Sequence, residues 1–266
     1  MIDFTIFDVG SAGKFEYEKL DKICKYLNIH SFDLEKKREK NEFKSFHHNY
    51  NLVSSSSKKS NFYLTKNPAA SSLKKPNNKI ISRWRSDQSF KIKKKIKDIK
   101  TITLDKYIKN NKIKQIDFLH ITAQASDLDI IKGIKNNLKK VSIIQCQVEF
   151  VKNYTNQNLF DDTIMFLRKQ NFRFIKFIEK GEWNDKYIFA KAIFINEDYN
   201  NSFINSKKII FLKLIGFDEE ANWLCKDIVH NKNLIPKFNN FYKKKNLIFK
   251  IRKLIKSFLL QYVNLI

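Results

Sequence analysis

Residues 116–133, IDFLHITAQASDLDIIKG, decide the fold class because they place three elements in immediate succession. IDFLHI is an apolar run typical of a buried strand, TAQAS is a short polar turn, and DLDIIKG is typical of a helix. A strand, a tight turn and a helix in this order are typical of a parallel sheet with helical connections. The turn also raises a functional question, because the strand closes on Ile121 and Thr122 where a catalytic domain would place a charged group.

The same alternation of strand and helix extends on both sides of this stretch. We expect strands at 4–8, 28–32, 49–53, 61–65, 116–121, 142–149, 172–178 and 187–195. We expect helices near 14–27, 34–42, 127–138 and 158–170. The pattern predicts an α/β fold in which a largely parallel sheet carries helices on both faces.

Two segments depart from the alternation. Residues 66–100 are polar and basic and too long for a simple connection, so they predict a lid or substrate-facing loop insertion. After about residue 205 the pattern is helical only. We therefore predict a domain at 1–200 and a helical C-terminal extension at 205–266.

Composition limits the functional classes. Of 266 residues, 52 are Lys or Arg and 27 are Asp or Glu, and the net charge of +25 points to nucleic acid, an anionic membrane or an acidic substrate. The lysines are spread along the chain rather than massed in one block, so much of this charge is expected to be solvated surface. A hydrophobic content of 42% is enough to bury the core of one sizeable domain with an appendage.

Cysteine usage and the N-terminus indicate the compartment. Cys24, Cys146 and Cys225 are far apart and odd in number, which favours a reducing environment over a disulfide framework. The opening MIDFTIFDVG lacks the basic flank of a signal peptide, and no apolar stretch reaches the roughly 18 residues needed to span a bilayer. We expect a cytoplasmic protein.

The first strand leads into a turn suited to ligand binding. In FTIFDVGSAGKF, Asp8 ends the strand, and Gly10 and Gly13 allow the backbone to turn tightly and pass close to a ligand. Asp33 follows the second strand, where an acidic residue can accept hydrogen bonds from both hydroxyls of a ribose. An ordinary turn and a helix cap are the structural alternatives for these two features.

The spacing of the glycines favours one class of cofactor. A pyrophosphate needs a G-x-G-x-x-G loop, whereas here one glycine is missing and Asp8 would repel phosphate. S-adenosylmethionine carries an ammonium and a sulfonium and no phosphate. The loop therefore favours S-adenosylmethionine over NAD.

Three long stretches carry a family resemblance. They are NFYLTKNPAASSLKKPN at 61–77, TITLDKYIKNNKIKQIDFLHITAQASDLDIIKGIKNNL at 101–138, and IIQCQVEFVKNYTNQNLFDDTIMFLRKQNFRF at 143–174. In this order they resemble the FkbM family of S-adenosylmethionine-dependent methyltransferases, and the likeness runs from about residue 4 to 195. The resemblance implies a Rossmann-like class I methyltransferase sheet that methylates a hydroxyl of a glycan, glycolipid or secondary-metabolite precursor.

The resemblance also implies roles for individual residues. The methionine end of the cofactor would be held by Asp8, Gly10, Ser11 and Gly13. Asp33 would bind the ribose, and the loop with Ser71 and Ser72 would lie over the active site. The acceptor would be a sugar or a glycolipid.

The opening stretch departs from the family pattern. Where the family has Asp, an acid or Gln, Gly and Glu, this chain has Thr122, Gln124, Ala125 and Asp127. Threonine cannot take a hydroxyl proton at neutral pH, so we expect Asp127 or Glu149 to be the catalytic base. His120 is expected to be a core or surface residue, and His47 and His48 to be structural.

Two features leave alternatives open. The basic run at 243–266 has apolar positions at helical spacing, so it either packs on protein or contacts an anionic membrane. Thr122 leaves open a catalytically degenerate binding protein with the same fold. The charge leaves open a nucleic-acid methyltransferase, although an Asn-Pro-Pro-Tyr-like tetrad and a clustered RNA-binding motif are absent.

Overall fold

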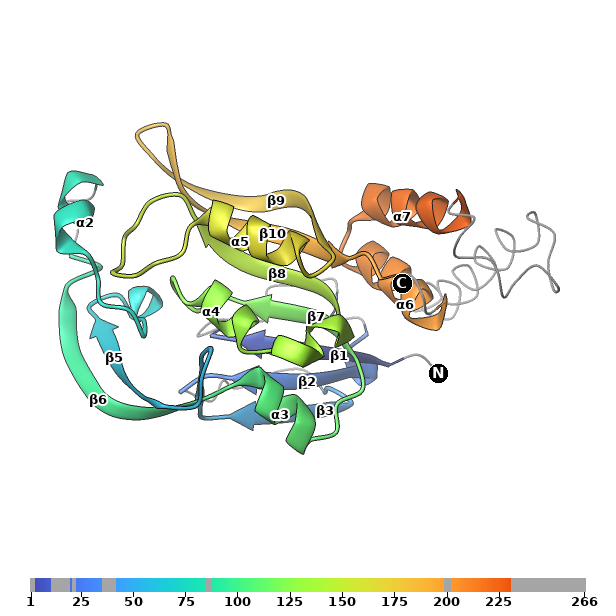
Figure 1. The fold of residues 1–266 in the computed structure, drawn as a ribbon, viewed down its shortest axis with the longest axis horizontal. Coiled ribbons are helices and arrows are strands. Elements are labelled where there is room, and N and C mark those ends of the chain that lie inside the picture. The colour runs from blue at the N-terminus through green and yellow to red at the C-terminus, as the bar shows by residue number, and fades with distance from the viewer. Residues whose placement is uncertain are drawn as a thin grey trace.

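A seven-stranded sheet forms the centre of the molecule. A computed structural model describes residues 3–10, 20, 23–34, 42–84, 88–198 and 202–230 (Figure 1). In sheet order the strands are β3 (Ser45–Asn49), β2 (Leu27–Phe32), β1 (Phe4–Val9), β7 (Ile116–Ile121), β8 (Val141–Glu149), β10 (Lys186–Asn196) and β9 (Phe172–Trp183). The first five are parallel to one another, and β10 is antiparallel to both of its neighbours. This mostly parallel sheet with helices confirms the predicted α/β fold.

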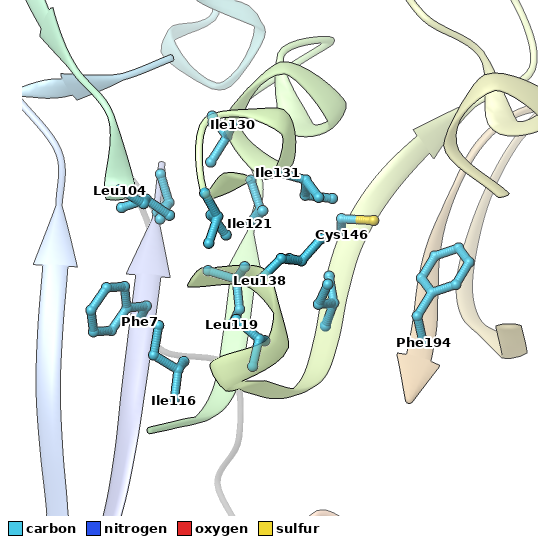
Figure 2. Packing of buried hydrophobic residues seen from close by; sticks show 14 of the residues in the cluster. Phe7, Leu104, Ile116, Leu119, Ile121, Ile130, Ile131, Leu138, Cys146 and Phe194 are labelled. Atoms are coloured by element: carbon cyan, nitrogen blue, oxygen red, sulfur yellow. The ribbon is translucent and has the colours of Figure 1, made fainter. Parts of the chain in front are cut away.

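Helices cover both faces of this sheet. One face carries α3 (Leu104–Asn110), α4 (Asp127–Lys132) and α5 (Phe160–Arg168), and the other carries α6 (Ser202–Leu214), on which α7 (Asp218–His230) packs. Because side chains alternate along a strand, Phe7 and Leu119 join the core under α3 and α4 (Figure 2). Ile6 and Phe118 join the core under α6. Every residue of β7 is buried, including Asp117 and His120, as predicted for a strand covered on both faces.

A buried ion pair joins α6 to the sheet. The Nζ of Lys207 lies 2.7 Å from Oδ2 of Asp117, and the same oxygen accepts the backbone N–H of Thr5 at 2.8 Å. Burial raises the pKa of Asp117, and Lys207 acts in the opposite direction. The helical pattern after residue 205 therefore begins with a helix that belongs to the core of the sheet. Residues 231–266, with the basic run at 243–266, lie outside the described residues.

An insertion between β3 and α3 builds a second, smaller sheet. Its strands are β4 (Leu52–Val53), β6 (Ile92–Ile102) and β5 (Lys59–Thr65), in that order, and it also holds the 3-10 turn η2 (Pro68–Ala70) and helix α2 (Asn78–Trp84). The expectation of a loop over 66–100 is wrong for its second half, because β6 pairs antiparallel with β5. Ile96 lies opposite Phe62 in this pair. An apolar face shared by two strands thus stabilises a segment that reads as polar.

Several other boundaries differ from those expected. The strand expected at 49–53 is split, since β3 ends at Asn49 and β4 begins at Leu52. The helix expected to reach residue 27 ends in a 3-10 turn at Cys24–Tyr26, because β2 begins at once. The helix expected at 127–138 stops at Lys132 and continues as the 3-10 turn η3 (Lys135–Lys140). Residues 14–19, 21–22 and 35–41 of the other expected helical segments lie outside the described residues.

Two further expectations can be compared with this structure. Within the described part of the chain, Cys24, Cys146 and Cys225 form no disulfide with one another. Among the described residues, no helix is long and apolar enough to cross a membrane.

Gly133 provides a test of how closely α4 approaches the insertion. A Cβ at this position would lie 2.4 Å from the backbone oxygen of Ser54 and 3.2 Å from Cα of Ser55. Gly133 is the C-cap of α4 and has a negative φ of −73° that alanine can adopt, so backbone entropy alone would make Gly133→Ala stabilising by about 0.4–1 kcal/mol. We expect destabilisation by about 1–3 kcal/mol instead, because two backbone segments must separate. Urea denaturation measures the sign, and a stabilised variant would show that the two segments do not touch.

Candidate active site

The carboxyl ends of β1, β2 and β7 meet at one edge of the central sheet. In Figure 1 their arrows point towards the curved pair β5 and β6, which lies beyond this edge. Ligands of open α/β sheets bind outside the carboxyl ends of the strands. Two adjoining pockets lie here, and they share the residues Ala69 and Gln124.

Backbone contacts at Gly10 tie the three strand ends together. The Gly10 N–H donates to the carbonyl of Phe32 at 2.9 Å, and the Thr122 hydroxyl donates to the carbonyl of Gly10 at 3.2 Å. Gly10 has a φ of 74°, a conformation that favours glycine. A Cβ here would lie 3.0 Å from both Cα of Ala123 and the oxygen of Thr122. Glycine therefore permits the turn after β1 to touch the turn after β7.

The first pocket, which we call the Asp33 pocket, opens above these contacts. It is lined by Val9, Gly10, Phe32, Asp33, Leu34, Leu52, Val53, Phe62, Leu64, Pro68, Ala69, Ser71, Ser72, Leu73, Thr122, Ala123, Gln124, Ser126 and Ile130. Among these described lining residues, Asp33 is the only charged one. The pocket thus offers apolar walls, one carboxylate, and no Lys or Arg to bind a phosphate.

Residues 71–77, which we call the roof segment, cover this edge of the sheet. The hydroxyl of Ser72 donates to the carbonyl of Gln124 at 2.7 Å, and Lys74 forms an ion pair with Asp129 of α4 at 2.8 Å. The N–H of Asn77 donates to the carbonyl of Asn153 in the loop after β8 at 2.8 Å. Ser71 and Ser72 therefore line the Asp33 pocket, and the Ser72 hydroxyl holds the turn after β7.

The second pocket, which we call the Glu149 pocket, lies on the other side of Gln124. It is lined by Asn67, Ala69, Ala70, Ser89, Phe90, Gln124, Gln147, Glu149, Asn153, Tyr154, Gly181, Glu182, Ile188 and Phe189. The Tyr154 hydroxyl donates to the carbonyl of Ala70 at 2.8 Å, and its ring meets Phe90 edge-on at 5.7 Å. These contacts fix one wall of the pocket to the insertion. Among the described lining residues there is again no Lys or Arg.

The turn TAQAS forms the wall between the two pockets. Gln124 and Ala125 both have positive φ values, 33° and 64°, so the chain bends sharply after β7. The Gln147 amide donates to Oε1 of Gln124 at 3.4 Å and to Oε1 of Glu149 at 2.6 Å. The turn has no charged side chain before Asp127. Its Gln124 accepts a hydrogen bond from the Gln147 amide, which also binds the Glu149 carboxyl group of β8.

Glu149 has the electrostatic properties expected of a proton acceptor. It ends β8, is buried, and lines the pocket. Burial raises its pKa from 4.5 to about 7, against the opposing effect of hydrogen bonds from Gln147 and Gln157. A carboxyl group with this pKa exchanges a proton readily near neutral pH.

Asp127, predicted as an alternative base, lies away from both pockets. It begins α4, is buried, and lines neither pocket. Its Oδ1 accepts the backbone N–H of Gln147 at 2.9 Å. Burial raises its pKa well above the usual range, and the nearby Glu149 raises it further. Asp127 therefore joins α4 to β8 through its hydrogen bond to the Gln147 backbone.

Asp8, predicted to bind the cofactor, does not line the Asp33 pocket. Alternation along β1 points Asp8 to the same face as Phe4 and Ile6, and there its Oδ1 lies 2.8 Å from Nδ1 of His120. Both side chains are buried, so His120 is a core residue, as expected. The sequence placed Asp8 near the end of a strand, and the structure directs its side chain to the face covered by α6.

The remaining predicted residues divide into two groups. Gly10 and Asp33 line the first pocket, whereas Ser11 and Gly13 lie outside the described residues. Sequence reasoning missed Gln147, Gln157 and Tyr154. Polar residues at alternate positions of β8 were the available signal for Gln147, because they mark one face of that strand.

Thr122 provides a test of the contact between the two turns. Thr122→Val removes the hydroxyl that donates to Gly10, and we expect a loss of about 1 kcal/mol in unfolding free energy. Thr122→Ser keeps the donor and is the matched control. Thr122→Asp places a carboxylate against the Gly10 carbonyl, so it should destabilise more than Thr122→Val. Chemical denaturation of the three variants measures these differences, and a stabilising Thr122→Asp would contradict the assigned contact.

Comparison with known proteins agrees with this geometry. Residues 11–174 match the family described as the Methyltransferase FkbM domain, and this range holds the roof segment, the turn after β7 and Glu149. No curated protein and no solved structure gives a significant match to the chain. Because the match covers more than half of the 266 residues, the chain belongs to the FkbM methyltransferase family.

Proposed function

We propose that this methyltransferase uses S-adenosylmethionine to methylate a hydroxyl group of a glycan, glycolipid or secondary-metabolite precursor. One observation carries the proposal. Two pockets at the carboxyl edge of the sheet share the Gln124 wall, and the second holds a buried carboxyl group whose pKa is about 7. A donor and an acceptor bound on the two sides of Gln124 would meet at this wall.

The Asp33 pocket fits the proposed cofactor. S-adenosylmethionine is cationic at its sulfur and amino groups and carries no phosphate, which suits a pocket whose only charged lining residue is an acid. Asp33 would accept hydrogen bonds from the ribose, while Phe32 and Leu52 offer apolar surface to the base. When bound there, the cofactor would supply an electrophilic methyl group.

The Glu149 pocket fits a neutral, hydroxyl-bearing acceptor. In a chain with 52 Lys and Arg residues, its described lining offers amides, aromatic rings and two carboxyl groups but no cation. Amide groups and aromatic faces suit the hydroxyls and the C–H surfaces of a sugar. Glu149 would accept the hydroxyl proton as the oxygen becomes methylated, and Gln147 would hold the carboxyl in place.

This arrangement also bears on the alternative of a degenerate binding protein. That alternative rests on Thr122, which stands where the family has an acid. Here the Thr122 hydroxyl bonds to the Gly10 carbonyl, and Glu149 supplies a carboxyl group at the pocket. The missing acid at position 122 therefore does not by itself remove the base.

Isothermal titration calorimetry tests the cofactor site. We expect the purified chain to bind S-adenosylmethionine, and Asp33→Ala to weaken binding by about 1–3 kcal/mol through loss of a charge-assisted hydrogen bond. Asp161→Ala, at an exposed position on α5, is the control and should leave the affinity unchanged. Absence of heat from the wild-type chain at millimolar cofactor would refute the proposal.

Transfer of labelled methyl groups to a cell-envelope glycan extract tests the base. We expect Glu149→Gln to lower the rate by about 10²–10⁴-fold with unchanged cofactor affinity. The wild-type rate should rise with pH through about 7, because the carboxyl must be ionised to accept a proton. Glu182 lines the same pocket at an exposed position, and Glu182→Gln is therefore the matched control. Equal losses in both variants would mean that Glu149 is not the base.

The same group predicts a pH dependence of stability. The pKa of Glu149 is raised in the folded chain from 4.5 to about 7, so the folded state binds the proton more tightly. Stability is therefore lost as pH rises from about 4.5 to about 7, by an amount on the order of 3 kcal/mol. Glu149→Gln should remove this slope, and an unchanged slope by urea denaturation at several pH values would contradict the assignment.

A further inference from the structure

A set of exposed lysines begins at the mouth of the Glu149 pocket. Asn67 and Ser89 line that pocket, and the N–H of Asn67 donates to the carbonyl of Ser89 at 3.2 Å. The next residues outward are Lys66 and Lys91, joined by a backbone hydrogen bond of 2.9 Å, and both are exposed. The end of the β5–β6 pair at Lys66 and Lys91 therefore borders the opening of the Glu149 pocket.

The lysines continue along the outer face of this strand pair. We call the set the lysine track: Lys59, Lys66, Lys91, Lys93, Lys95, Lys97 and Lys100. Lys94 lies opposite Leu64, which lines the Asp33 pocket, so it belongs to the inner face. Lysines at alternate strand positions are about 7 Å apart, so the track offers regularly spaced charges.

The charges of the track are not neutralised by the described part of the chain. Lys59 lies directly opposite Lys100, a like-charge pair that disfavours the strand pairing. Among the described residues, no lysine of the track takes part in an ion pair. Asp98 is the one acid within β6, and it sits at a bulge with a φ of 57°. The face is therefore left cationic, which suits an anionic ligand.

The form of the track selects among anionic ligands. A single phosphate is bound best by the planar fork of Arg, and the track contains only Lys. Single-stranded nucleic acid needs aromatic rings for stacking, but the outer face offers Tyr63, whose ring already lies 5.7 Å from the Lys95 ammonium. A membrane is flat, whereas β6 follows a pronounced curve (Figure 1). An extended, flexible polyanion fits all three observations.

We propose that the lysine track binds an anionic glycan chain, with carboxylate or phosphate groups along it, whose neutral terminal sugar enters the Glu149 pocket. The described lining of the pocket contains no Lys or Arg, whereas the adjacent track consists of lysines. A single acceptor suits both surfaces if its reacting end is neutral and the rest of its chain is anionic. The inference rests on the proposed function for the identity of the acceptor pocket. Binding of the chain by the track does not require methyl transfer.

Fluorescence anisotropy with a labelled oligogalacturonate, a carboxylate-bearing glycan, tests the track. We expect the triple variant with Lys93→Gln, Lys95→Gln and Lys97→Gln to bind oligogalacturonate at least about tenfold more weakly than wild type. Its binding should also depend less on salt concentration. The matched control removes three exposed lysines from other surfaces, Lys109→Gln, Lys114→Gln and Lys139→Gln, and should bind within about twofold of wild type. Both variants should keep the wild-type melting temperature and affinity for S-adenosylmethionine.

Three outcomes would overturn the inference. Equal losses in both triple variants would show that binding follows net charge. Loss of sedimentation with phosphatidylglycerol vesicles only in the track variant, with oligogalacturonate binding unchanged, would assign the track to a membrane. Tighter binding of a similarly charged oligothymidylate through the same lysines would assign it to nucleic acid. Selective oligogalacturonate binding by a chain that does not bind S-adenosylmethionine would refute the proposed function and, with it, the role of the Glu149 pocket, while binding of an anionic glycan by the lysine track would stand.

Discussion

The contact between the Gly10 backbone and the turn after β7 determines how this edge of the sheet is built. Gly10 can touch that turn because it has no side chain, and the Thr122 hydroxyl and the Phe32 carbonyl fix its backbone from two other strands. Once these ends are held together, the turn can divide the space above them. The roof segment then holds the turn from above through Ser72. The two pockets follow from this single constraint.

Charge is distributed unevenly around this edge. The chain carries +25 overall, yet the described residues that line the two pockets include no Lys or Arg. The buried cations are used in structure, as Lys207 is when it joins α6 to Asp117. The exposed cations include the lysines on the outer face of β6. Net charge alone therefore describes the surface of this protein and gives no information about the chemistry of its pockets.

The sequence predicted the central sheet well and the insertion poorly, for a physical reason. The central strands β1, β7 and β8 bury residues on both faces, so they can be recognised in the sequence without their neighbours. Over most of its length strand β6 is exposed, with Ile92, Ile96 and Ile99 partly buried, and the bulge at Asp98 breaks their period of two. A segment of this kind becomes a strand only through its partner β5. The partner cannot be inferred from local pattern.

The candidate site was predictable to the extent that strand ends are predictable. Asp33 and Glu149 follow or end their strands, and the structure places both at a pocket. Asp8 ends β1 equally well but faces the core under α6, because its direction depends on which face of the sheet each strand presents. Asp127 begins α4, is buried, and lines neither pocket. The direction of the Asp8 side chain and the burial of Asp127 both depend on how the elements pack in the folded chain, so local sequence does not reveal them.

The shared wall between the two pockets has a thermodynamic consequence. Gln124 contributes to both pockets, and its position depends on hydrogen bonds from Ser72 on one side and Gln147 on the other. A ligand that orders Gln124 from one side removes conformational freedom that a second ligand would otherwise have to remove. The two binding equilibria are then linked, and the linkage must be reciprocal. Occupancy of either pocket would therefore raise affinity at the other by the same factor, whichever ligand binds first.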